Sequence, residues 1–121
     1  MEQPPLPQLP PASVSFDDGI LRAIDVGDVY FSAEDGLAES RYVFIDGSGA
    51  LDALAHASHL IIAETGFGTG LNLLALCEAI TKAGSSCQID FISFEAAPLE
   101  AKDARLAHNA FPELTRLSLD L

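Results

Sequence analysis

The sequence has few basic residues. Six Lys and Arg stand against 18 Asp and Glu, which gives a formal net charge of −12 over 121 residues. A nucleic-acid backbone is held by Lys and Arg that face its phosphates, and a strongly acidic surface repels polyanions. The charge balance therefore argues against this chain gripping RNA or DNA by itself.

Cysteines and long apolar runs are also scarce. We interpret the two cysteines, Cys77 and Cys87, as reduced core thiols of a cytosolic protein, with a disulfide between them as the alternative. No stretch is apolar for long enough to cross a bilayer. The N-terminus, MEQPPLPQLPPAS, has neither the basic start nor the apolar centre of a secretory signal. We therefore expect a cytoplasmic protein without membrane contact.

The N-terminus is instead rich in proline, which favours an extended conformation without internal hydrogen bonds. We expect a disordered tail over residues 1–15, and a ligand for a proline-binding domain is the alternative. The other residues have an ordinary globular composition, 49% hydrophobic and 20% charged for the whole chain. We divide them into a hairpin and helical extension over 16–58 and a partial α/β domain over 59–121.

In the extension, strands are expected over 21–24 and 29–31, joined by a turn at 25–28. Ser32 lies three positions before Asp35, a weak capping pattern for a helix that starts near residue 33. The DGSG turn precedes a second helix over 51–57.

Residues 59–121 alternate between short apolar runs and helical patterns. Strands are expected over 60–63 and 89–94, and helices over 69–83 and 99–109. Gly84 should end the first helix, Glu78 should lie on its outer side, and Pro98 should lie in the first turn of the second helix. Leu106 and the alanines of that helix should face inward. Two parallel strands joined by a helix need a crossover, which opens a doubly wound α/β sheet.

Three glycines at alternate positions lie where the first strand gives way to a helix, and an acid precedes them: Glu64, Gly66, Gly68 and Gly70. Glycine reaches positive φ and lets a ligand approach the backbone. The following helix offers unpaired N–H groups and the positive end of its dipole. Ligands of such sheets bind beyond the carboxyl ends of the strands. The turn is therefore the predicted binding site, although packing alone also produces glycine turns.

The common nucleotide motifs do not fit this turn. A P-loop needs Gly-Lys-Ser/Thr, but Leu71 and Asn72 are found here, and a dinucleotide fingerprint needs glycine in place of Leu71. Glu64 would repel a pyrophosphate and suits a cationic amino group. Glu95 ends the next strand, where a carboxylate can bind both hydroxyls of a ribose. A ligand with an amino acid at one end and a nucleoside at the other would satisfy both acids, and S-adenosylmethionine is such a ligand. The alternative is an NAD- or nucleotide-binding module.

Four segments together resemble the methyltransferase domain of the MnmC family, which modifies the wobble uridine of tRNA. They begin at Gly27, Ala63, Ile89 and His108 and read GDVYFSAEDGLAESRYVF, AETGFGTGLNLL, IDFISFEAAPL and HNAFPEL. The resemblance implies the N-terminal half of a class I, Rossmann-like S-adenosylmethionine-dependent methyltransferase fold, preceded by a small β-hairpin and a helix. It also implies methyl transfer to the aminomethyl group of 5-aminomethyl-2-thiouridine.

The resemblance also implies roles for individual residues. Tyr30 is similar to a residue that lines the cofactor or substrate mouth, and a half-buried hairpin aromatic is the alternative. Arg41 and Asp35 either belong to the same entrance or pair at the surface. The other residues implied in cofactor binding are Glu64, Gly66, Phe67, Gly68, Gly70, Asn72 and Glu95.

The family's methyltransferase domain has further strands, and its bifunctional members add an FAD-dependent oxidase domain. Neither is found in these 121 residues, so we expect a truncated form that carries the cofactor half-site. tRNA would be bound through regions largely absent here, and a non-catalytic remnant that acts only through a partner is the alternative. The first parallel strand should have an open apolar edge.

No catalytic residue is assigned, because alignment and desolvation matter more than acid–base catalysis when a sulfonium is the leaving group. His56 and His59 have a spacing seen in metal sites, but no further ligands gather nearby, so no metal site is predicted. His108 is expected at the surface or in the core and not in catalysis.

Overall fold

The computed structural model describes residues 4–5, 8–17, 20–25, 27–30 and 36–120. The predicted helix start with Ser32 and Asp35, and the last residue of the second predicted hairpin strand, lie outside the described residues.

A small antiparallel sheet opens the chain, in the order β1 (Val14–Asp17), β2 (Ile20–Ala23) and β3 (Asp28–Val29). The predicted hairpin is confirmed as the β2–β3 pair, with Ala23 opposite Asp28. The sequence interpretation missed β1, which is only four residues long and begins inside the segment assigned to the tail. The backbone of that segment is anchored, because the Ala12 N–H donates to the Pro98 carbonyl oxygen at 2.8 Å.

Three short helical segments follow: α1 (Gly36–Glu39), the π-helical segment η1 (Ser40–Asp46) and α2 (Ala50–His56). Arg41 in η1 donates two hydrogen bonds of 2.7 Å to the two carboxylate oxygens of Glu78. This fork joins the helical extension to α3 (Leu71–Ala83) and gives Arg41 a structural role. Lys82 also contacts Glu78, at 3.5 Å. The prediction that Glu78 lies on the outer side of its helix is wrong, since its side chain is only 14% exposed.

The second half has the strand–helix–strand order that the sequence predicts. Strand β4 (His59–Thr65) pairs in parallel with β5 (Gln88–Phe94), from His59 opposite Gln88 to Thr65 opposite Phe94. Helix α3 crosses between them and ends at Gly84, which has φ +60°. Helix α4 (Ala101–His108), the 3-10 turn η2 (Pro112–Leu114) and α5 (Thr115–Asp120) complete the described chain.

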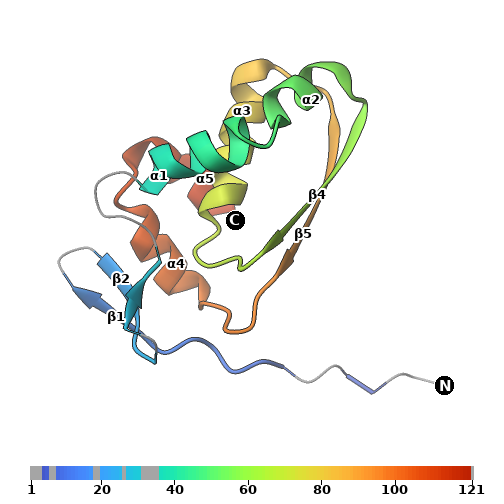
Figure 1. The fold of residues 1–121 in the computed structure, drawn as a ribbon. Coiled ribbons are helices and arrows are strands. Elements are labelled where there is room, and N and C mark those ends of the chain that lie inside the picture. The colour runs from blue at the N-terminus through green and yellow to red at the C-terminus, as the bar shows by residue number, and fades with distance from the viewer. Residues whose placement is uncertain (1–3, 6–7, 18–19, 26, 31–35, 121) are drawn as a thin grey trace.

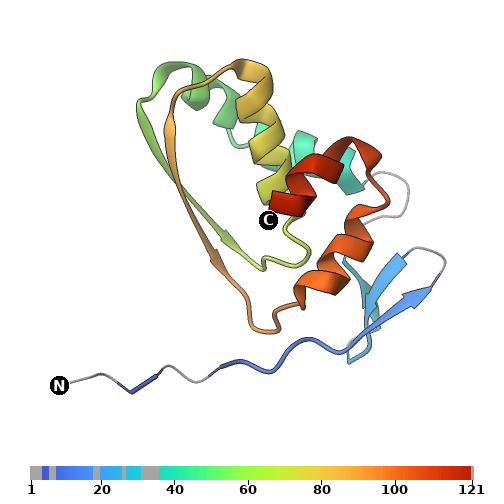
Figure 2. The same cartoon turned by 180° about the vertical axis from the view of Figure 1, so that it is seen from behind.

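The core lies between the helices and one face of the β4–β5 pair, because alternate strand residues point to opposite faces. The helices gather on one side of this pair in both views (Figure 1, Figure 2). Leu60, Ile62, Ile89 and Phe91 are the strand residues that pack against the core cluster. The buried members of that cluster are Leu37, Ile45, Leu54, Leu71, Leu74, Ala75, Leu76, Phe111 and Leu114.

The opposite face of the strand pair is exposed. Ile61 is 67% exposed, Ile92 45% and Phe94 65%. Among the described strands β4 pairs only with β5, so the expected open edge of the first parallel strand is confirmed. The exposed face is an additional feature that the sequence interpretation did not include.

Two expectations for α4 are wrong. The helix begins at Ala101 after Glu100, so Pro98 precedes it and does not lie in its first turn. Leu106 is 46% exposed and Ala101 is exposed as well, whereas Ala104 and Ala107 are buried as expected. Residues 104, 107 and 108 form the inward stripe at helical spacing, and residue 106 lies on the other side of the helix.

Candidate functional site

The glycine turn joins β4 to α3, and its backbone has the conformation that selects glycine. Gly66, Gly68 and Gly70 have φ values of +81°, +56° and +80°, which side chains with a Cβ rarely adopt. The Gly66 N–H donates to the Phe94 carbonyl oxygen at 2.6 Å, and the Gly70 N–H donates to the Phe67 carbonyl oxygen at 2.9 Å. The turn is thus tied to the end of β5 and closed on itself.

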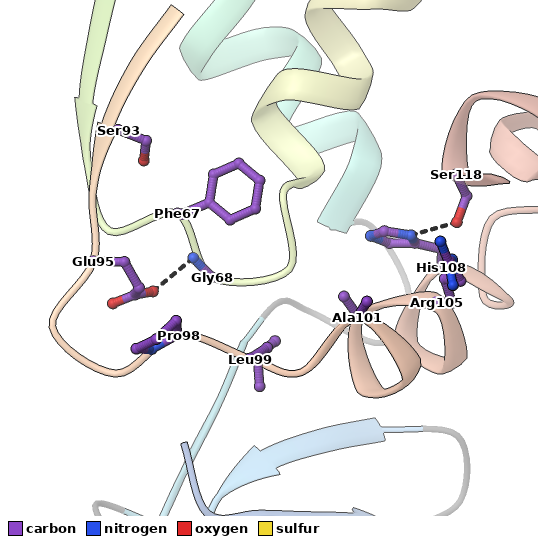
Figure 3. Close-up of a pocket in the computed structure, with 11 residues that line it drawn as sticks. Phe67, Gly68, Ser93, Glu95, Pro98, Leu99, Ala101, Arg105, His108 and Ser118 are labelled. Carbon is purple, nitrogen blue, oxygen red and sulfur yellow. Dashed lines mark hydrogen bonds between the residues drawn. The ribbon is translucent and has the colours of Figure 1, made fainter. Parts of the chain in front are cut away.

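Glu95, the first residue after β5, reaches this turn. Its Oε1 accepts a 2.8 Å hydrogen bond from the Gly68 N–H (Figure 3). Its Oε2 accepts one of 3.4 Å from the Ala97 N–H. The predicted ribose-binding acid therefore lies beside the predicted cofactor loop. The adjacent carboxyl ends of two parallel strands cause this proximity.

Glu64 lies on the face of the strand pair that α3 covers. Its Oε1 accepts a 3.0 Å hydrogen bond from the Ser93 hydroxyl, directly opposite in the ladder. Its Oε2 accepts a 3.0 Å hydrogen bond from the Asn72 amide in the first turn of α3. The structure therefore brings Glu64 and Asn72 together, as expected for two parts of one loop.

Two cavities lie on either side of the turn, and Phe67 and Gly68 line both of them. The first has a volume of about 480 Å³ and is bounded by Glu95, Pro98 and Leu99. The second has a volume of about 580 Å³, and the residues that line it include Tyr30, Ser40, Gly66, Thr69, Leu71 and Asn72.

Glu64 lines neither of these cavities. It borders a third hollow of about 440 Å³ with Asn72 and Phe94. Glu64 and Glu95 therefore border different cavities, and Ser93, which donates to Glu64, lines the cavity next to Glu95. A Cβ at Gly68 would meet only the Tyr30 Cδ1, at 3.5 Å.

Tyr30 follows β3 and borders the second cavity next to Gly68. Its backbone N–H donates to the Leu21 carbonyl oxygen at 3.2 Å, which fixes its place in the small sheet. Partial burial raises the pKa of the Tyr30 phenol, and the negative charges of Glu95 and Asp103 add to this effect. Tyr30 is thus a neutral hydroxyl among the residues that line the second cavity.

The sequence interpretation did not find the buried polar residues behind the turn. His108 is 2% exposed, and its Nε2 and Nδ1 lie 2.6 Å from the Thr69 carbonyl oxygen and from the Ser118 Oγ. The segment HNAFPEL contained the available signal, but spacing alone could not connect residue 108 to residue 69. Burial lowers the pKa of His108, and the positive charge of Arg105 acts in the same direction. The hydrogen bond to the Thr69 carbonyl acts in the opposite direction.

The other two histidines have separate partners. His59 Nε2 lies 2.7 Å from an Asp90 oxygen, and His56 Nδ1 lies 2.9 Å from the Asp52 carbonyl oxygen. Within the described residues, no three His, Cys, Asp or Glu side chains come close enough to hold a metal ion. None of the helices described there has the length and apolar character needed to span a bilayer.

Comparisons with known proteins identify relatives of this chain. No protein-family model matches the sequence. The chain is 42% identical over 122 residues to the tRNA 5-methylaminomethyl-2-thiouridine biosynthesis bifunctional protein MnmC of Marinobacter nauticus, covering 95% of this chain and 19% of that protein. It is 44% identical over 100 residues to MnmC of Aeromonas salmonicida, covering 78% and 15%. For MnmC of Maricaulis maris, the identity is 45% over 98 residues, covering 80% and 17%.

A solved structure, MNMC2 from Aquifex aeolicus, has a similar fold. The TM-score is 0.63 at 24% identity, over 78% of this chain and 32% of that one. The fold is that of a mixed α/β protein with a parallel strand pair and a glycine turn at the end of its first parallel strand. The chain belongs to the MnmC family of tRNA modification proteins, and it spans 15 to 19% of the length of the curated relatives described above.

Proposed function

We propose that this chain forms the S-adenosylmethionine-binding part of a Rossmann-like methyltransferase that modifies the wobble uridine of tRNA. The single observation that carries the proposal is the hydrogen bond from the Gly68 N–H to Glu95. It brings an acid suited to a ribose against a turn whose three glycines leave the backbone accessible. The relatives' names support tRNA modification as the reaction context.

The residues present fit the proposed cofactor. Each carboxylate oxygen of Glu95 accepts one hydrogen bond and has a further lone pair for a ribose hydroxyl. Gly70, the N-cap of α3, makes no side-chain capping bond, so the first N–H groups of this helix are available to the carboxylate of an amino acid. Glu64 supplies a negative charge for the amino group.

The bound cofactor would supply a methyl group on a positively charged sulfur. This sulfur is already a good leaving group, so its departure needs no acid. The contribution of this chain is then to bind, orient and exclude water. Phe67, Pro98 and Leu99 give the cavity next to Glu95 an apolar wall suited to an adenine ring. The acceptor amine must be neutral to attack, and we assign no base to it within this chain.

Charge limits the role of the chain in binding tRNA. The chain has few Lys and Arg and a net charge of −12. Affinity for a nucleic-acid backbone depends on the number of phosphates that such cations neutralise. We therefore assign cofactor binding to these residues, and we assign the tRNA contacts to parts of the enzyme outside this chain. A tRNA substrate implies a cytoplasmic enzyme.

The test is isothermal titration calorimetry of the chain with S-adenosylhomocysteine, with NAD as the competing ligand. The variants are Gly68→Ala and, as a matched control, Gly84→Ala. Both glycines have positive φ, +56° and +60°, so alanine costs each site a similar backbone strain of about 1 kcal/mol. Gly84 ends α3 far along the chain from the turn, and a Cβ there meets nothing within 4 Å.

We expect Gly68→Ala to bind the ligand at least tenfold more weakly than wild type, which corresponds to about 1.4 kcal/mol. Gly84→Ala should bind like wild type. Tighter binding of NAD would assign the turn to a dinucleotide. No heat with either ligand would reject cofactor binding by this chain.

A further inference from the structure

Three polar side chains are buried behind the glycine turn, and they come from three different elements. Thr69 in the turn is 4% exposed, His108 in α4 is 2% exposed and Ser118 in α5 is 5% exposed. They are the only polar or charged residues classed as buried in the described part of the chain. His108 connects the other two residues, because its Nδ1 lies 2.6 Å from the Ser118 Oγ and its Nε2 lies 2.6 Å from the backbone carbonyl oxygen of Thr69. Figure 3 shows the contact with Ser118 at the edge of the first cavity.

The partners determine which ring nitrogen carries the proton. A carbonyl oxygen only accepts hydrogen bonds, so the His108 Nε2 must donate to Thr69. The ring is buried and Arg105 is the charged group that acts on it, which favours the neutral form. The Nδ1 of a neutral ring that is protonated at Nε2 is an acceptor, so the Ser118 hydroxyl donates to it. The acceptor-only Thr69 carbonyl thereby selects the tautomer, and the Ser118 hydroxyl satisfies the other ring nitrogen.

The hydrogen bond to Thr69 controls the orientation of one peptide group. The Thr69–Gly70 peptide is held at both ends, since its carbonyl accepts from His108 and its N–H donates to the Phe67 carbonyl oxygen. A rotation of this peptide would break both bonds and change φ at Gly70, which is +80°. Gly70 immediately precedes α3, so the orientation of this peptide sets how the turn enters the helix.

We propose that His108 is a positioning residue for the cofactor turn: as the Nε2-protonated tautomer, with Ser118 on its other ring nitrogen, it locks the Thr69–Gly70 peptide in the ligand-binding orientation. α4 and α5 then control the shape of a binding turn that they do not themselves form. The effect on ligand affinity rests on the proposed function, whereas the effect on the turn does not.

Two substitutions of similar size separate positioning from simple packing. In His108→Gln the amide nitrogen takes the place of Nε2 and can still donate to Thr69. In His108→Asn the shorter amide takes the place of Nδ1 and cannot reach Thr69. Both replace the ring by a neutral amide in the same helix. Asn is one methylene shorter than Gln, so its extra loss of packing is monitored at a strand residue away from the turn.

The first readout is amide hydrogen exchange of Gly70 in the free protein, compared with Ile62 in the centre of β4. The expected result is exchange at Gly70 about tenfold faster in His108→Asn, as for the loss of one buried hydrogen bond, with Ile62 unchanged. His108→Gln should remain within about threefold of wild type at both sites. A long-range ¹⁵N–¹H spectrum of the wild-type ring should show the Nε2-protonated tautomer.

The second readout is the affinity for S-adenosylhomocysteine, which should fall about tenfold in His108→Asn and be restored in His108→Gln. Equal Gly70 exchange in the two variants, or an Nδ1-protonated ring, would overturn the positioning role. If the exchange pattern appears but wild-type protein binds no ligand, the proposed function fails and the positioning of the turn stands. If wild type binds and both variants bind equally well, the positioning role fails and the proposed function stands.

Discussion

Replacing Glu95 by Gln gives a sharp test of the site, because the substitution keeps the size of the side chain and removes its charge. The carboxylate accepts from two backbone donors, the Gly68 N–H at 2.8 Å and the Ala97 N–H at 3.4 Å. A glutamine has only one amide oxygen, so one of these donors would face an NH₂ group. Hydrogen bonds to charged groups contribute about 1.5–3 kcal/mol, and the partial exposure of Glu95 places the expected loss near the lower figure.

The expected result for Glu95→Gln is a decrease of about 1.5 kcal/mol in the free energy of unfolding, together with a loss of at least tenfold in affinity for S-adenosylhomocysteine. Urea denaturation and calorimetry measure the two quantities separately. The matched control is Glu113→Gln, which removes an acid that is 49% exposed and lies 3.9 Å from Arg41. If Glu95→Gln binds the ligand as tightly as the control does, Glu95 does not contact the ligand and the reasoning about the strand end is refuted.

Further predictions concern stability, pH and the exposed face. Arg41→Met should lower the free energy of unfolding, measured by urea denaturation, by about 1 to 2 kcal/mol, because it breaks both hydrogen bonds to Glu78. A change below about 0.3 kcal/mol would mean that this pair contributes nothing to stability. The hydrogen bonds from Arg41 hold the pKa of Glu78 below its ordinary 4.5, so the fork is fully stabilising above that pH and weakens as the pH falls through the folded-state value. Burial holds the pKa of His108 below 6.5. The contribution of this group to the free energy of unfolding should therefore be constant above pH 6.5 and should decrease below it, because the unfolded state binds the proton first. In His108→Gln this part of the pH dependence should vanish, and an unchanged profile would assign it to another group. Replacing Ile61 by Thr, on the exposed face of β4, should change the free energy of unfolding by less than about 0.5 kcal/mol, and a larger loss would show that this face is covered in solution.

Much of the α/β half could be predicted because its signals are local. The apolar runs of β4 and β5, the glycines at positive φ and the stop at Gly84 each follow from the properties of a few neighbouring residues. The proximity of Glu95 to the glycine turn could also be predicted, since parallel strands end at the same edge of their sheet.

The features that the sequence did not reveal depend on contacts between distant residues. The sequence predicts Arg41 at an entrance or at the surface, but its partner is Glu78, 37 positions away. His108 bonds to Thr69, 39 positions away, and no spacing rule connects them. The inward side of α4 was misjudged because the position of a short helix depends on what packs against it, and Leu106 was assigned from hydrophobicity alone.

The most direct test of the central claim is an amide chemical-shift titration of the ¹⁵N-labelled chain with S-adenosylhomocysteine. The account predicts saturable shifts at Gly66, Gly68, Gly70, Asn72 and Glu95, with Gly84 and the amides of α2 unchanged. A saturable titration that leaves the glycine turn unperturbed and shifts another surface, or no shift at any concentration of ligand, would contradict it.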